Sequence, residues 1–162
     1  MLQTITISEI TAQLEFPVIV ESRFGDLVIR EEDLLSFPNG IYGFEDYNSY
    51  ALTNFAGQTL TDFRVLQCLD EIGLVFILTP LTYQGTKLVN ENDLLEAADG
   101  LNIPMENCDF FAITTVSESP QGLQFQLNLK APIVIDNRSR QAFQYILQNT
   151  DYPVNHKIAI NT

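Results

Sequence analysis

The sequence predicts a mainly β protein, a small antiparallel barrel-like or sandwich domain with one principal short helix. Three observations support this prediction. Short runs rich in apolar, β-branched and aromatic residues recur along the chain, turn residues separate them, and a single segment carries helix signals. Many short strands with frequent turns are typical of an antiparallel sandwich or barrel rather than of a fold that alternates strands with helices. The length of 162 residues corresponds to about one domain.

The clearest strand lies at 123–129, where Leu123, Phe125, Leu127 and Leu129 alternate with polar residues. Such alternation places one side of a strand on a core and the other side in water. Runs of similar composition predict further strands at 18–20, 27–30, 49–53, 63–66, 74–79, 110–116, 133–135 and 143–147. Residues 18–162 are therefore expected to form a single domain. Residues 1–17 are an N-terminal extension, for which an edge strand, a short helix and a mobile arm remain open.

The helix is expected at 92–99. Asn92 can cap its start, and Gly100 can end it. Asp93 and Glu96 favour the positive N-terminal end of the helix dipole. The segment therefore predicts a surface helix that rests on the β body. Its apolar face consists of Leu94, Leu95 and Ala98.

The charge of the chain is unusual. Only 8 Lys and Arg stand against 21 Asp and Glu, which gives a formal net charge of −13 and disfavours direct binding of nucleic acid. No Lys or Arg occurs between Lys87 and Lys130. Two interpretations of this stretch remain open, a solvated acidic surface and a landing site for a basic partner. Its acids are Glu91, Asp93, Glu96, Asp99, Glu106, Asp109 and Glu118.

Residues that could support catalysis or metal binding are scarce. The single histidine, His156, lies near the C-terminus, and Cys68 and Cys108 are far apart and expected to be buried thiols. Neighbouring acids at turns do not have the spacing of a calcium loop, and no phosphate-binding loop or nucleophile elbow is present. We therefore expect no catalytic residue, metal or cofactor. Without a long apolar run or a signal peptide, a cytoplasmic protein that does not contact membranes is expected.

Two stretches look more constrained than strands and turns require. The first, 37–45, reads Phe-Pro-Asn-Gly-Ile-Tyr-Gly-Phe-Glu, which as a purely structural element is a tight turn with glycine at positive φ and Phe44 buried. The second, 128–140, contains Pro132 between two apolar runs. A proline has no N–H to give to a sheet, so Pro132 predicts an edge, a bulge or a corner, followed here by a hairpin.

Together these stretches resemble the flagellar assembly factor FliW family. The segment 37–45 is similar to the family pattern F-P-x-G-I-x-G-F-E, and 128–136 is similar to N-L-x-A-P-I-V-I-[ND]. Between them, 66–68 resembles the family's L-Q-S, with Cys68 in place of serine, and 144–147 resembles its Q-V-x-L strand. The resemblance covers about 18–152, and nothing is carried over to the first residues.

The resemblance implies a non-enzymatic protein that switches between two partners. Family members bind newly made flagellin, and they bind and antagonise the translational repressor CsrA, so that flagellin synthesis follows export. A strongly acidic chain suits a basic RNA-binding repressor. The alternative is a β-barrel that binds a small ligand, or an enzyme of unknown substrate. The candidate partner-binding residues are Gly40, Tyr42, Gly43, Phe44, Glu45, Glu91, Asp93, Glu96, Asp99, Asn128, Asp136 and Asn137.

Overall fold

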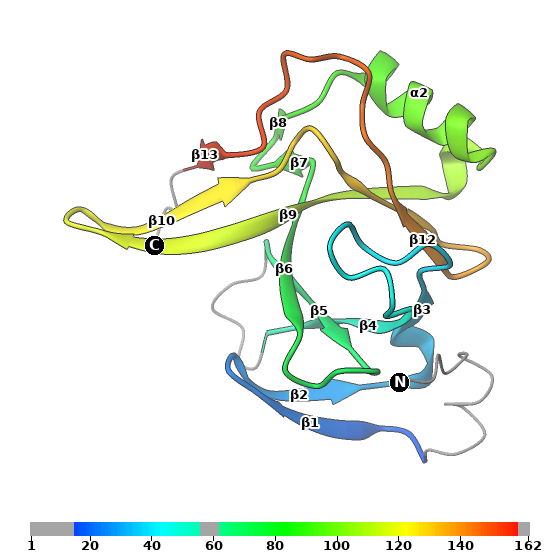
Figure 1. The fold of residues 1–162 in the computed structure, drawn as a ribbon, viewed down its shortest axis with the longest axis vertical. Helices are drawn as coiled ribbons and strands as arrows, with labels where there is room; N and C mark the ends of the chain where they lie inside the picture. The colour runs from blue at the N-terminus through cyan, green and yellow to red at the C-terminus, as the bar shows by residue number, and fades with distance from the viewer. Residues whose placement is uncertain (1–14, 56–61, 159–162) are drawn as a thin grey trace.

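The structure is a computed structural model that describes residues 15–55 and 62–158 (Figure 1). Its largest sheet consists of β3 (Leu34–Ser36), β4 (Ser49–Asn54), β5 (Arg64–Cys68), β6 (Val75–Pro80), β9 (Cys108–Ser119), β10 (Gly122–Leu127), β11 (Ile133–Asp136), β12 (Gln141–Gln144) and β13 (His156–Ile158). Two hairpins stand beside it, β1 (Val18–Ser22) with β2 (Gly25–Ile29), and β7 (Thr82–Tyr83) with β8 (Thr86–Lys87). The helical elements are α2 (Glu91–Leu101) and the 3-10 turns η1 (Glu31–Asp33) and η2 (Met105–Asn107).

The large sheet curls until its strands meet again. Its order is β11-β12-β3-β4-β5-β6-β9-β10-β13, and an additional pairing of β11 with β9 closes the strands from β11 to β9 into a ring. All pairings are antiparallel except that of β12 with β3, which involves one residue pair. The second half of β9 leaves the ring and runs with β10 as an arm that projects from the body (Figure 1). These findings confirm the predicted mainly β, antiparallel, barrel-like class.

Every strand of the ring contributes to one apolar cluster, and this cluster fills the inside of the ring. Its fully buried members include Phe37, Tyr50, Leu66, Leu78 and Ile133. The rings of Phe37 and Tyr50 meet edge to face, with their centroids 4.8 Å apart. Large side chains therefore fill the interior of the ring, the space in which a ligand-binding barrel would hold its ligand.

Most predicted strands are present, with small shifts at their ends. The predicted run 143–147 differs most, because β12 already ends at Gln144. Beyond it, the N–H groups of Tyr145 and Leu147 donate to the carbonyls of Pro132 and Lys130, so this segment follows the loop before β11 and leaves the sheet. Strands β3, β7, β8 and β13 were not predicted, because two or three residues are too few to show a period.

The helix is present but its predicted ends are wrong. The capping position is Asn90, not Asn92, and the helix continues through Gly100 to Leu101. It ends at Asn102, which takes the left-handed conformation with φ +58°, a role that asparagine tolerates nearly as well as glycine. Gly100 has a different use, because a Cβ there would lie 2.8 Å from the ring of Tyr145. Leu95, predicted on the buried face, is 38% exposed.

No helix in the two described segments is long and apolar enough to cross a lipid bilayer. Of the predicted N-terminal extension, 1–17, residues 1–14 lie outside the described part of the chain, so the alternatives for it stay open.

Candidate functional site

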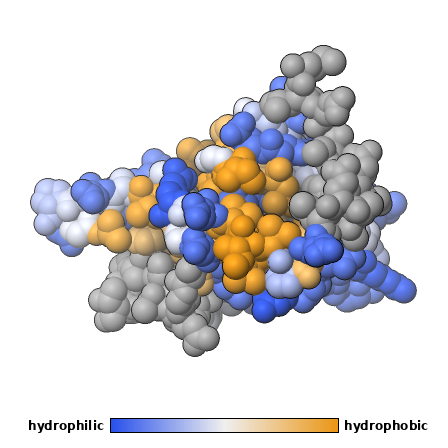
Figure 2. Space-filling model, turned by 90° about the horizontal axis from the view of Figure 1, so that it is seen from below, coloured by the Kyte–Doolittle hydropathy of each residue, from blue (hydrophilic) through white to orange (hydrophobic). Residues whose placement is uncertain are grey.

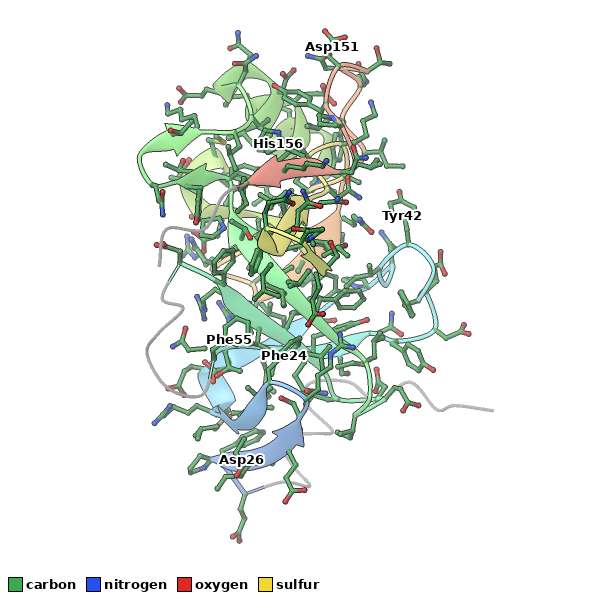
Figure 3. The ribbon with its side chains drawn as sticks, turned by 90° about the vertical axis from the view of Figure 1, so that its left-hand side faces the viewer. Phe24, Asp26, Tyr42, Phe55, Asp151 and His156 are labelled. Atoms are coloured by element: carbon green, nitrogen blue, oxygen red, sulfur yellow. The ribbon has the colours of Figure 1, made fainter. Side chains whose placement is uncertain are left out.

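The first constrained stretch forms a loop that stands out from the body between β3 and β4. Gly40 and Gly43 have φ values of +68° and +89°, which confirms the predicted glycine turns. The N–H of Gly40 donates to the carbonyl of Phe37 at 2.9 Å, and the N–H of Phe44 donates to that of Ile41. The loop therefore doubles back twice, and Tyr42 projects from it with 56% of its surface exposed (Figure 3).

The loop is tied to the second constrained stretch by one side chain. Gln144 of β12 accepts a hydrogen bond from the N–H of Tyr42 at 3.0 Å and donates its own amide to the carbonyl of Ala131 at 3.2 Å. Asn128 stabilises the same corner, because its Oδ1 accepts from the N–H of Ala131. Two sequence motifs more than 80 positions apart thus meet through a single glutamine.

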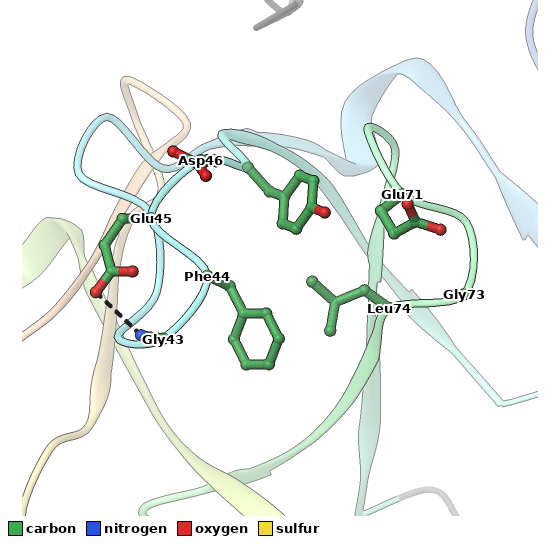
Figure 4. A pocket seen from close by; sticks show the side chains of 8 residues that line it. Gly43, Phe44, Glu45, Asp46, Glu71, Gly73 and Leu74 are labelled. Carbon is green, nitrogen blue, oxygen red and sulfur yellow. Dashed lines mark hydrogen bonds between the residues drawn. The ribbon is translucent and has the colours of Figure 1, made fainter. Parts of the chain in front are cut away.

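Beside this loop the surface forms a hollow of about 540 Å³, the loop-side hollow (Figure 4). The side chains of Phe44 and Leu74 point into it from two sides, and Asp46 and Glu71 lie on opposite sides of its mouth. The hollow therefore has an apolar floor and an acidic rim. It is lined by Gly43, Phe44, Glu45, Asp46, Tyr47, Glu71, Gly73 and Leu74.

The rim carries an ionised carboxylate that is fixed in place. Glu45 accepts a hydrogen bond from the N–H of Gly43 at 3.0 Å, and this bond, followed by one from its own backbone, lowers the pKa of the carboxyl group. Tyr47 also lines the hollow, and burial foremost and then the nearby charge of Glu71 raise its pKa. The rim is therefore negative at neutral pH.

A second hollow of about 520 Å³ adjoins the first and shares Phe44 and Leu74 with it. This fork-side hollow lies where β6 and β9 separate, and it includes Arg23, Phe76 and Val116. Phe44 is 38% exposed and its ring meets that of Phe76 edge to face at 5.5 Å, so the expectation that Phe44 is buried is wrong. Its ring is a wall between two hollows and not part of the core.

The acids of α2 serve the fold in part. Asp93 accepts a hydrogen bond of 2.6 Å from the hydroxyl of Tyr152, and Glu96 accepts one from the N–H of Gln148 at 3.2 Å. Glu91 lies 3.6 Å from Lys87 in an exposed ion pair. Asp99 is exposed at the far end of the helix. Two of these four candidate residues thus hold the segment that precedes β13, and Glu91 and Asp99 face solvent.

The turn after β11 accounts for two further candidates. Oδ1 of Asp136 accepts hydrogen bonds from the N–H groups of Arg138 and Ser139, which confirms the predicted hairpin turn. Burial raises the pKa of Asp136, but these hydrogen bonds outweigh it, so the pKa is lowered overall. The N–H of Asn137 donates to the carbonyl of Asn107 at 2.8 Å. Asp136 and Asn137 therefore stabilise backbone turns.

The thiols and the histidine form no cluster. Cys68 is fully buried in β5, as expected, and burial raises the pKa of its thiol. Cys108 is half-buried, so the expectation of a buried thiol is wrong there. His156 lies in β13, opposite Leu127. Among the described residues, no three His, Cys, Asp or Glu side chains are placed to hold a metal ion.

A further apolar surface lies on the β1–β2 hairpin. Ile19 and Val28 face each other across the two strands and are 66% and 39% exposed. Seen from below, the face that carries this hairpin has hydrophobic atoms gathered near its centre (Figure 2).

Comparison with known proteins gives one consistent result. The family model described as FliW protein matches residues 17–158. The chain belongs to the FliW family. It is 30% identical over 138 residues to the flagellar assembly factor FliW of Leptospira interrogans, and the aligned region covers 83% of this chain and 88% of that protein. It is 29% identical over 143 residues to that of Ruminiclostridium cellulolyticum, covering 87% and 93%.

A solved FliW structure has the same architecture. A crystal structure of the flagellar assembly factor FliW matches 88% of this chain and 98% of its own with a TM-score of 0.66 and 28% sequence identity. The resemblance drawn from the two sequence motifs is thereby confirmed.

The sequence predicted the loop but not the two hollows beside it. Arg23, Leu74, Phe76 and Ile113 line the hollows, and they come from segments far apart in the chain. Leu74, Phe76 and Ile113 fall in predicted apolar strands, where an apolar side chain at the surface has the same local pattern as one in the core, and Arg23 falls between a predicted strand and a turn. No signal in the sequence distinguishes the two.

Proposed function

We propose that this chain is a non-enzymatic flagellar assembly factor of the cytoplasm, which binds newly made flagellin and the translational repressor CsrA and switches between them. The observation that carries the proposal is the family match over residues 17–158, together with relatives named for flagellar assembly. When flagellin is abundant it occupies the factor, and CsrA is free to repress. After export of flagellin the factor binds CsrA, and translation resumes.

Charge and surface support this proposal. An RNA-binding repressor carries basic surface, and a net charge of −13 complements it. The accessible surface of 9286 Å² is much larger than the roughly 800 Å² that each partner of a standard interface covers. The apolar hollows suit an amphipathic segment, which a flagellin monomer exposes when its terminal regions are not packed in a filament.

The test is competition between the two partners. CsrA affinity is measured by calorimetry with and without saturating flagellin, and we expect flagellin to weaken it, because a switch requires negative coupling and coupling is reciprocal. Equal affinities, with a ternary complex on a sizing column, would rule out partner switching. Failure to bind either protein would rule out the proposed function altogether.

The electrostatic part has its own measurement. Association with CsrA is expected to slow as salt rises, since exposed acids steer a basic partner over distances that salt screens. Glu71→Gln removes an acid from the rim of the loop-side hollow and is expected to slow association more than Glu21→Gln, which removes an exposed acid on β1 that lines neither hollow. Equal association rates for both variants would show that the rim is ordinary solvated surface.

A further inference from the structure

The strands β6 and β9 form a fork. Their pairing ends at Ile77 and Thr114, although β9 continues to Ser119 and β6 begins two residues earlier, at Val75. Had the ladder continued, Val75 would lie opposite Val116. The guanidinium of Arg23 instead donates to the carbonyl of Val75 at 3.2 Å. The fork-side hollow occupies the space between the two separated strands.

The edge of β9 in this fork has free backbone groups. The N–H of Asn128 donates to the carbonyl of Ile113, so the backbone of Ile113, and of every second residue from it, faces β10. The backbone groups of Val116 and Glu118 must then face the fork. In 15–55 and 62–158 these two N–H donors and two carbonyl acceptors have no hydrogen-bond partner. Val116 lines the apolar hollow, and Glu118 lies farther out along the same edge.

We propose that this fork binds an extended segment of a protein partner, which adds a strand to β9 by pairing its backbone with Val116 and Glu118. Strand addition places alternate side chains of the segment on opposite faces. One set would meet Phe44 and Phe76, and the other would meet Phe24, which also lines the hollow. The set that meets two rings, Phe44 and Phe76, would therefore be apolar, and a β-branched residue such as valine or threonine would suit the set that meets Phe24. The inference deepens the proposed function and rests on it for the existence of a protein partner.

The charges around the fork determine which charged residues would suit the two ends of the bound segment. Glu118 is exposed at the outer end of the edge, and Glu45, Asp46 and Glu71 surround the adjoining loop-side hollow. Arg23 is the only base that lines either hollow among the described residues. Lys or Arg at both ends of the segment, flanking its apolar residues, would complement these acids. A second copy of the chain is a poor occupant, because it would bring the same acids and a second charge of −13 to the edge.

The decisive variant is Val116→Pro. The N–H of Val116 faces the fork, so proline removes a donor from the fork and no bond from the β9–β10 ladder, the position where an edge strand tolerates proline. The matched control Val116→Ala shortens the same side chain and keeps the N–H. The probe is a short synthetic peptide of alternating valine and threonine with lysines at both ends, and a second peptide has glutamates in place of the lysines.

We expect the wild-type protein and Val116→Ala to bind the lysine peptide within a few-fold of each other. Val116→Pro is expected to bind it about tenfold more weakly, the loss of one buried hydrogen bond. The glutamate peptide is expected to bind more weakly than the lysine peptide. Equal affinity of Val116→Pro and Val116→Ala would overturn the inference, as would an amphipathic helical peptide that binds all three proteins better, or a wild-type dimer that Val116→Pro dissociates.

A second measurement needs no change in the protein. If Val116→Pro unfolds, lysine peptides that are N-methylated at alternate backbone positions are compared on the wild type. One of the two alternate sets is expected to lose binding, because only that set points its N–H groups at β9, and equal binding of both would contradict strand addition. Binding of the peptide without binding of flagellin or CsrA would refute the proposed function alone. Binding of those proteins with equal affinity by the alanine and proline variants would refute the strand addition alone.

Discussion

The two glycines of the loop that follows β3 have the same backbone requirement but different surroundings, and this makes a quantitative prediction. Gly40 is buried at φ +68°, and a Cβ added there would lie 2.6 Å from Cα and 2.8 Å from the carbonyl oxygen of Glu45. Gly43 has φ +89°, and a Cβ added there meets nothing within 4 Å. Replacing each with alanine therefore separates backbone strain from steric overlap.

The expected magnitudes follow from these distances. Alanine in the left-handed region costs about 1–2 kcal/mol of unfolding free energy, which is the whole effect expected for Gly43→Ala. At Gly40 the contacts are with backbone atoms, which cannot rotate away, so overpacking of about 1–3 kcal/mol adds to the strain. Gly40→Ala is therefore expected to cost about 2–5 kcal/mol, a large share of the ~5–15 kcal/mol stability of a typical domain.

Urea unfolding followed by circular dichroism measures both variants. A loss that is equal for Gly40→Ala and Gly43→Ala would refute the reasoning, because it would show that the loop accommodates the added Cβ without moving Glu45. If the reasoning holds, the displaced Glu45 also alters the loop-side hollow, so Gly40→Ala is expected to weaken partner binding more than Gly43→Ala does.

Two further predictions concern hydrogen bonds that hold the fold. Tyr152→Phe removes the hydroxyl that donates to Asp93 at 2.6 Å, and we expect it to lower the free energy of unfolding by about 1–2 kcal/mol in the same assay. The control Tyr42→Phe changes an exposed tyrosine and should leave the unfolding midpoint unchanged. Equal effects of the two variants would contradict the role given to Tyr152. Asp136 has a folded pKa below its ordinary value of 3.8, so its ionised form stabilises the fold above that pH and this stabilisation is lost as pH falls through the lowered pKa. Acid titration of Asp136→Asn should show a smaller loss of stability below pH 3.8 than the wild type, and identical acid profiles would show that the turn does not depend on the charge.

The sequence by itself determined those features that depend on neighbouring residues. Gly40 and Gly43 occupy positive φ because the short loop they frame requires it, and the pattern of turn residues was sufficient to predict this. The alternation from Leu123 to Leu127 predicted β10, since a strand with one face on the core has a period of two. Phe125 and Leu127 are buried as this pattern predicts, but Leu123 is 64% exposed because it lies on the arm that projects from the body. Four ordered segments, at 37–45, 66–68, 128–136 and 144–147, were enough to predict the family, which the match over 17–158 confirmed.

The tertiary structure decided what depends on residues distant in the chain. Glycine and asparagine both end helices, and only the structure shows that Gly100 lies inside the helix against the ring of Tyr145 while Asn102 takes the left-handed position at its end. Phe44 carries the same apolar signal as a core residue, yet it lies at the surface because the loop places it beside Phe76. The fork depends on where the ladder between two strands stops, and no local pattern encodes that point. Local backbone preferences are properties of a few adjacent residues, whereas grooves and free edges arise only when separate segments are brought together and fail to cover one another.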